Sequence, residues 1–263
     1  MMRGVSGFTA LALTATLLAS PAASANTDFD HDHTVWNELL RRYVRNDGAI
    51  TDVDYAGLSR ARSELERYHG LLSEVTPAQY DSWSADKRLA FLINAYNAFT
   101  VGLIIDNDPV DSIKDLGGWF SSPWKKRFFD LLGARRHLDD IEHGMIRRQF
   151  REPRIHFAVN CAARGCPPLR AEAYVPHRLD TQLEENARIF LNDPRRNRLD
   201  IERSVLEISA VMKWYREDFE DVYGSLEAFL APRMTRDPAV AAAIRTGGLR
   251  LRVLDYDWSL NGT

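Results

Sequence analysis

The segment from Leu89 to Ile105 constrains the fold most, because it is apolar on nearly every side. Ser84 precedes it as a helix-capping residue, and Asp86 places an acid near the positive end of the helix dipole. A helix without a polar face is buried rather than amphipathic. We therefore expect a buried helix here.

Two amides, Asn94 and Asn97, interrupt this apolar segment at a spacing that places both on one side of the helix. A buried amide without a hydrogen-bond partner costs about 1–3 kcal/mol. Both side chains must therefore meet polar partners. They either clamp a neighbouring loop or line a functional site, and the sequence leaves both interpretations open.

The rest of the chain contains more helical than extended patterns. Helical spacing and capping residues predict helices at 34–44, 139–150, 180–191, 209–224 and 239–245, and alternation predicts a strand at 154–160, a hairpin at 199–208 and a strand at 249–253. This pattern is typical of an α+β fold. We expect a helix-rich single domain with a small, mostly antiparallel sheet, for which a papain-like or transglutaminase-like arrangement is one candidate.

The first 25 residues have the pattern of a secretory signal peptide. Arg3 supplies the positive charge, residues 8–18 the apolar core, and Ala23-Ser-Ala25 the small residues of a cleavage site. The core is too short for a membrane-spanning helix of about 20 residues. We expect a signal peptide at 1–25, a single domain at 26–263, a periplasmic or secreted location, and no membrane span after cleavage.

The charge balance bears on the partner. The chain has 34 basic and 37 acidic residues and a formal net charge of −3. Nucleic-acid-binding domains carry basic patches, so this balance argues against a nucleic-acid partner. We expect no cofactor, and a small molecule or peptide of unknown identity as the ligand.

Both cysteines, Cys161 and Cys166, lie in one segment that begins at His156. A thiol in an exported protein is either oxidised to a disulfide or kept reduced for a reason. A disulfide can close across the turn-prone Ala162-Ala-Arg-Gly165. Alternatively, Cys161 is a nucleophile, which needs an imidazole as base and an amide or carboxylate that orients the imidazole.

The candidate bases are His143 and His156, and the candidate orienting groups are Asn94, Asn97 and Glu142. On the expected strand His156 lies five residues before Cys161 and points to the opposite face, which favours His143. The two histidines and two cysteines are zinc-ligand types, but they lack the short paired spacings of zinc sites. We therefore expect no metal.

A set of aromatic residues either fills the core and plugs loops or walls an apolar ligand cleft. The set consists of Trp119, Trp124, Trp214, Tyr215 and Trp258.

Several motifs occur in one order along nearly the whole mature chain. They are Val53-Asp-Tyr55, Phe91-Leu-Ile-Asn94-Ala-Tyr-Asn97-Ala, Ile141-Glu-His143-Gly-Met-Ile-Arg147, His156-Phe-Ala-Val-Asn-Cys161 with Cys166-Pro-Pro, Trp214-Tyr-Arg-Glu-Asp218-Phe, and Asp255-Tyr-Asp-Trp258-Ser-Leu-Asn261. Together they resemble the domain of unknown function 547 family of bacteria and plants. The resemblance implies a domain identity and no reaction. It also makes Cys161 the better candidate for a shared role, because serine can stand at the position of Cys166 in plant members.

The sequence thus predicts a site centred on Cys161. The catalytic candidates are Cys161, His143, Glu142 and Asn94, and the binding candidates are Asn97, Arg147, His156, Cys166 and Trp124. If the chain is an enzyme, we expect a thiol hydrolase or acyltransferase that acts on an amide or thioester bond. The alternative is a non-catalytic ligand-binding or scaffolding module with a Cys161–Cys166 disulfide.

Overall fold

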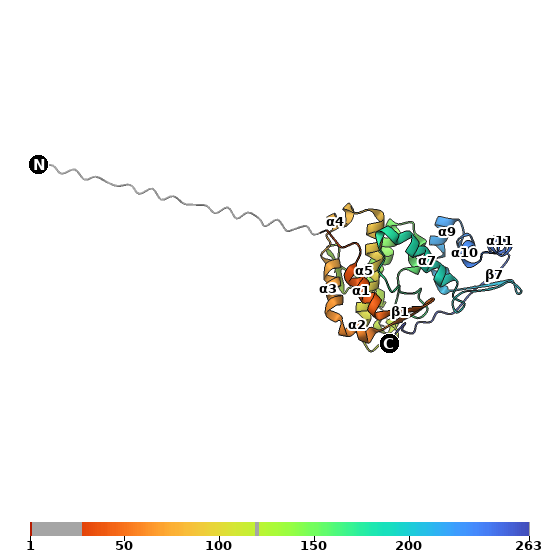
Figure 1. Ribbon diagram of the computed structural model, residues 1–263, viewed down its shortest axis with the longest axis horizontal. Coiled ribbons are helices and arrows are strands. Elements are labelled where there is room, and N and C mark those ends of the chain that lie inside the picture. Colours follow the sequence, from red (N-terminus) through yellow and green to blue (C-terminus); the bar gives the residue numbers. More distant parts are fainter. Residues whose placement is uncertain (2–27, 119–120, 263) are drawn as a thin grey trace.

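The computed structural model describes Met1, residues 28–118 and residues 121–262. The predicted signal peptide beyond Met1, and Trp119 of the aromatic set, lie outside the described residues. The described chain is mainly helical and carries three small sheets (Figure 1). This arrangement confirms the predicted α+β class.

Helix α5 (Ala85–Ile105) is the buried helix that the sequence predicts. The Ser84 side chain accepts a hydrogen bond from the backbone N–H of Lys87 and caps the first turn. Every residue from Leu89 to Ile105 is buried. The helix is long and apolar enough to cross a membrane, but 94% of its apolar window is buried inside the fold, which is typical of a core helix.

The elements before α5 contribute to the larger of two hydrophobic clusters. They are α1 (Thr34–Tyr43), β1 (Val44–Asp47), β2 (Ile50–Val53), α2 (Tyr55–Arg60), α3 (Arg62–Ser73) and α4 (Pro77–Ser82). Helix α1 confirms the prediction at 34–44. Strands β1 and β2 form an antiparallel hairpin, and its turn contains Gly48 at φ 57°, a conformation that glycine adopts readily.

Short elements connect α5 to the next long helix. They are η1 (Ile113–Leu116), η2 (Pro123–Lys125), β3 (Phe129–Leu131), β4 (Ala134–Arg136), η3 (Asp140–Ile146), α6 (Arg147–Gln149), η4 (Pro153–Phe157) and η5 (Pro176–Arg178). The helix predicted at 139–150 is present, but η3 is a π-helix. π-Helical turns are rare and occur frequently at functional sites.

The C-terminal elements form most of the second hydrophobic cluster. They are α7 (Leu179–Leu191), β5 (Arg198–Asp200), β6 (Val205–Ile208), α8 (Ala210–Trp214), α9 (Arg216–Tyr223), α10 (Leu226–Met234), α11 (Pro238–Arg245) and β7 (Arg250–Val253). Strands β5 and β6 form the predicted antiparallel hairpin, and β7 pairs with β6 in parallel. Figure 1 shows α9 to α11 at the end of the molecule opposite to α3 and α4. The helix predicted at 209–224 is divided into α8 and α9 at Tyr215.

The strand predicted at 154–160 is wrong, because the segment begins as the 3-10 helix η4. The prediction assumed one buried face, but every residue from 155 to 160 is buried. Side-chain amides satisfy the backbone of this segment. Asn97 donates to the carbonyl of Ala158 and accepts from the N–H of Asn160, and Asn186 donates to the carbonyl of Phe157.

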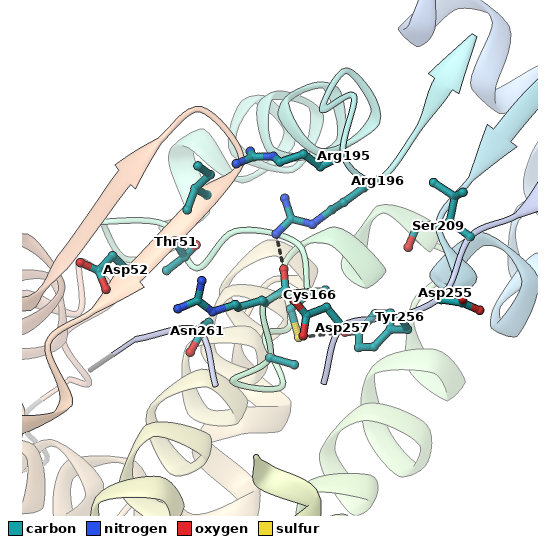
Figure 2. Close-up of a pocket in the computed structure, with 15 residues that line it drawn as sticks. Thr51, Asp52, Cys166, Arg195, Arg196, Ser209, Asp255, Tyr256, Asp257 and Asn261 are labelled. Carbon is teal, nitrogen blue, oxygen red and sulfur yellow. Dashed lines mark hydrogen bonds between the residues drawn. The ribbon is translucent and has the colours of Figure 1, made fainter. Parts of the chain in front are cut away.

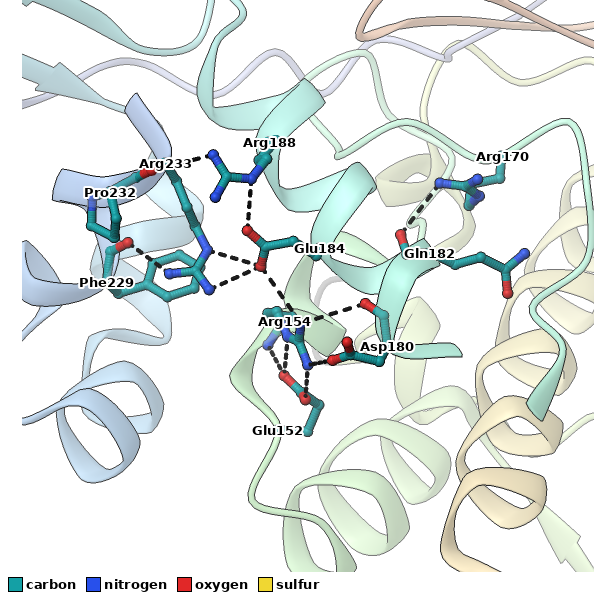
Figure 3. A network of polar contacts seen from close by, with 10 residues as sticks. All are labelled: Glu152, Arg154, Arg170, Asp180, Gln182, Glu184, Arg188, Phe229, Pro232 and Arg233. Carbon is teal, nitrogen blue, oxygen red and sulfur yellow. Dashed lines mark hydrogen bonds and ion pairs between the residues drawn. The ribbon is translucent and has the colours of Figure 1, made fainter. Parts of the chain in front are cut away.

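An ion-pair network holds η4 against α7 and α10 (Figure 3). Arg154 of η4 pairs with Glu152 and with Asp180 of α7. Glu184, one turn further along α7, pairs with Arg233 of α10. Helix α7 therefore fixes the segment that leads to Cys161 relative to the C-terminal helices.

Candidate functional site

A cavity of about 300 Å³ brings together most of the predicted site residues. Its walls combine aromatic rings, two carboxylates, two imidazoles and both sulfur atoms. The lining residues are Tyr96, Trp124, Asp139, Glu142, His143, His156, Val159, Cys161, Cys166, Pro167, Val211, Trp214, Tyr215, Tyr256 and Trp258. Helix α5, η3, the segment after η4, α8 and the C-terminal segment thus converge on one space.

Glu142 is the buried acid of this cavity, and only 4% of the residue is exposed. The hydroxyl of Tyr215 donates to its Oε1 at 2.6 Å, and the hydroxyl of Tyr96 also bonds this carboxylate. Burial, together with the nearby Glu142 charge, raises the pKa of both tyrosines. Both phenols therefore stay protonated near pH 7 and serve as hydrogen-bond donors to Glu142.

His156 lies between Glu142 and Asp218. Its Nε2 is 2.6 Å from Oδ2 of Asp218, and its Nδ1 is 4.0 Å from Oε1 of Glu142. The ring stacks on Tyr215 at a centroid distance of 3.6 Å. Burial lowers the pKa of His156, so the ring is neutral near pH 7 and places its proton on Nε2, toward the Asp218 carboxylate.

Arg147 connects Asp218 to His143. Its Nε and Nη2 donate to the two oxygens of Asp218 at 2.7 and 2.6 Å. Burial alone would raise the pKa of Asp218, but the hydrogen bonds from His156 and Arg147 hold it well below its usual range. Nη1 of Arg147 lies 3.2 Å from Nδ1 of His143. Because a guanidinium can only donate, Nδ1 accepts and the His143 proton is on Nε2.

Cys161 and Cys166 form a disulfide at the wall of the cavity. The hydroxyl of Tyr256 lies 3.2 Å from each of the two sulfur atoms. Among the described residues, no hydrogen bond joins the Cys161 sulfur to His143 or His156. The predicted thiol–imidazole contact is therefore not made in this oxidised form.

Aromatic rings form a continuous wall next to the disulfide. Trp258 contacts Trp124, Trp214 and Tyr256 at centroid distances of 5.8, 5.8 and 4.5 Å. Tyr256 also contacts Trp214 at 4.8 Å. Trp214 is 48% exposed, so this wall is open to solvent at one end. These rings line the cavity. Of the two roles that the sequence left open for the aromatic set, they therefore wall a cleft and do not fill the core.

Three predicted site residues do not line the cavity. Asn94 exchanges two hydrogen bonds with the backbone of Tyr174, at 2.7 and 3.0 Å. Asn97 clamps the backbone after η4 in the same way. Arg147 contacts two residues that line the cavity, His143 and Tyr215. Both amides thus hold loops, which is the first of the two interpretations that the sequence leaves open.

The orientation of His156 differs from the predicted one. The expected strand would have turned His156 away from Cys161, and this was the reason to favour His143. Because η4 replaces the strand, His156 and Cys161 line the same cavity.

Four site residues are missing from the sequence prediction: Tyr96, Asp139, Asp218 and Tyr256. Asp218 and Tyr256 lie within the motifs that carry the family resemblance, in Trp214-Tyr-Arg-Glu-Asp218 and Asp255-Tyr-Asp-Trp258. That membership was the available signal. Tyr96 likewise lies within such a motif, between Asn94 and Asn97. Asp139 carries no comparable signal apart from its position beside Asp140.

A second cavity, of about 410 Å³, shares Cys166 and Tyr256 with the first (Figure 2). Its three arginines are already bonded within the chain. Arg196 donates to the carbonyl of Ala49, Arg164 donates to the carbonyl of Leu260, and Arg195 pairs with Asp193. A third cavity, of about 690 Å³, lies between α1 and α3 and contains none of the predicted site residues.

Within residues 28–118 and 121–262, no group of three or more histidine, cysteine, aspartate and glutamate side chains is placed to hold a metal ion.

Comparison with known proteins gives one match. The family model described as protein of unknown function, DUF547, matches residues 80–191. The chain carries a domain of this family. No curated protein and no solved structure matches the chain. The DUF547 segment contains the acids, histidines and cysteines of the cavity, whereas Trp214, Tyr215, Tyr256 and Trp258 follow it.

Proposed function

We propose that this DUF547 protein is an exported ligand-binding module, and that the 300 Å³ cavity is its binding pocket. One observation carries the proposal: the Cys161 sulfur is bonded to Cys166 and contacts the Tyr256 hydroxyl, so no thiol faces the histidines. The disulfide then holds the loop beside the pocket in place. Export is supported by the signal-like sequence of residues 1–25.

The polar groups of the cavity also support a binding role. Ligand pockets are mostly apolar and carry a few fixed polar groups. Here Glu142 receives its hydrogen bonds from tyrosines, and His156 and Arg147 share Asp218. These groups are held by one another, which is the arrangement of a rigid recognition surface.

A cysteine-dependent acyl-transfer or hydrolase activity is the second candidate. It is supported by the position of Cys161, His143 and Glu142 around one cavity. A nucleophilic thiolate requires that an external dithiol first reduce the Cys161–Cys166 bond and itself become a disulfide. An imidazole must then take the thiol proton of Cys161. Substrates would be amides or thioesters, whose carbonyl carbon the thiolate attacks with loss of the amine or thiol.

Thiol chemistry separates the two candidates. We expect the protein purified from the exported fraction to have no free thiol and a mass two hydrogens below that of the fully reduced chain. In the Cys166→Ser variant, Cys161 should react with iodoacetamide at the rate of an ordinary thiol near neutral pH.

The control compares His143→Ala with His177→Ala in the Cys166→Ser background, because His177 is exposed and lies outside the cavity. A fast alkylation that only His143→Ala slows would overturn the binding proposal in favour of the thiol enzyme. Equal rates in both variants support the binding module.

A further inference from the structure

The charge of the cavity lining is one-sided. The lining contains two carboxylates, Asp139 and Glu142, and no lysine or arginine. Arg147 lies nearby, but Asp218 holds it in a two-point ion pair. The proton of His143 is on the ring nitrogen nearer to Asp139, and His156 is neutral. The pocket therefore offers negative charge to a ligand.

Asp139 is the carboxylate that lacks a strong partner. Among the described residues, its side chain accepts no hydrogen bond, and Nε2 of His143 lies 4.0 Å from its Oδ1. Glu142, in contrast, is occupied by Tyr215 and Tyr96. The side chain of Asp139 is only 20% exposed, and burial raises its pKa. A positively charged hydrogen-bond donor stabilises the ionised form of a half-buried carboxylate that has no other hydrogen bond.

The aromatic wall suits the same kind of ligand. The faces of tryptophan and tyrosine rings attract a cation that lies within about 6 Å of the ring centroid. Two of the lining rings already contact a cation of the chain: Nζ of Lys114 is 4.9 Å from the Trp258 centroid, and the Arg147 guanidinium is 5.5 Å from that of Tyr215. Neither cation lines the cavity.

We propose that the ligand of this pocket is a small organic cation, a primary or secondary ammonium group attached to an apolar body. The ammonium N–H donates to Asp139, and the apolar body lies against Trp124, Trp214 and Trp258. This inference rests on the proposed binding function and adds the chemical class of the ligand.

Three molecules of one shape and different charge test the inference: benzylammonium, benzyl alcohol and benzoate. Isothermal titration calorimetry and tryptophan fluorescence should show benzylammonium binding about tenfold more tightly than benzyl alcohol, with benzoate weakest. The Asp139→Asn variant should lose this preference.

Asp140→Asn is the matched control, because Asp140 is the next residue, does not line the cavity and pairs with Arg127 and His137. It should keep the preference for the cation. If benzyl alcohol or benzoate binds as tightly as benzylammonium, the ammonium assignment is overturned and the binding module stands. If none of the three binds and the fluorescence is unchanged, the ammonium assignment also fails, and the binding function fails for apolar ligands of this size.

Discussion

The acidic side of the cavity and its aromatic side come from different parts of the chain and are held in different ways. Asp139, Glu142 and His143 lie inside the segment that matches the DUF547 family, whereas Trp214 and Trp258 follow it. The acidic side is held by hydrogen bonds, because Tyr215 donates to Glu142 and Arg147 contacts Nδ1 of His143. The buried amides of α5 hold the adjacent backbone at Tyr174 and just before Cys161. The aromatic side is supported mainly by contacts among its own rings, and one of these, Trp214, is half exposed.

This difference shows that the matched segment alone makes an incomplete pocket. It supplies the polar groups, the disulfide and Trp124, but most of the wall that would contact an apolar ligand comes from residues after 191. Two residues of the C-terminal part cross to the acidic side: Tyr215 bonds Glu142, and Asp218 bonds His156 and Arg147. These contacts fix the two sides relative to each other.

The largest expected effect is on the backbone segments that the buried amides of α5 hold beside the cavity. Replacing Asn97 by leucine leaves the carbonyl of Ala158 and the N–H of Asn160 without their partner in the core. We expect a loss of about 3 kcal/mol in the free energy of unfolding, measured with urea. Asn94→Leu should act similarly, through the backbone of Tyr174.

Asn107→Leu is the control for this prediction. Asn107 follows the same helix and is half-buried, and among the described residues its side chain bonds only the carbonyl of Leu103. The free energy of unfolding should therefore fall by less than about 1 kcal/mol in Asn107→Leu. If the three variants unfold at the same urea concentration, the amides of α5 do not support the site.

The next effect concerns the contact between the two sides. Asp218→Asn removes the ion pair with Arg147 and weakens the bond with His156, which should lower stability by about 2 kcal/mol near pH 7. The folded pKa of Asp218 lies below its usual range, so this contribution is present above the unfolded value of about 3.9 and is lost as the pH falls through the folded pKa.

Unfolding experiments between pH 7 and pH 3 can follow this difference. The difference in the free energy of unfolding between wild type and Asp218→Asn should become smaller only below about pH 4. Asp221→Asn, on the same helix and exposed, should differ little from wild type at any pH. A gap that closes already near pH 6 would mean that a histidine, rather than Asp218, controls the contact.

The smallest effect on stability is expected on the aromatic side. Trp214→Leu changes a half-exposed side chain, so the free energy of unfolding should fall by less than about 1 kcal/mol. The affinity for benzylammonium should nevertheless fall severalfold, because one ring of the wall is lost. Ile189→Ala, a comparably exposed apolar residue on α7 outside the cavity, should leave the affinity unchanged.

Much of the fold could be predicted from local patterns. The apolar run and its capping serine predicted α5, and alternation around a polar middle predicted the β5–β6 hairpin. These predictions hold because periodic burial and helix capping depend on residues close together in the chain. The α+β class follows from them. The papain-like or transglutaminase-like arrangement stays a prediction.

The segment before Cys161 shows where local patterns fail. Its alternation predicted a strand, but Asn97 and Asn186, from two other helices, satisfy its backbone and allow a 3-10 turn. Which partners satisfy a backbone group is decided by residues distant in sequence, and alternation does not report them.

By itself, the sequence indicated candidate residues that line one cavity: the cysteine pair, the Glu142-His143 pair and His156. Only the tertiary structure decided how they are combined. Asp218 meets His156 across 62 residues and Tyr256 meets Cys161 across 95. Such contacts follow from the packing of the two hydrophobic clusters. Hydrophobic burial is not directional. The apolar pattern of one cluster therefore does not specify which polar side chains of the other cluster will lie next to it.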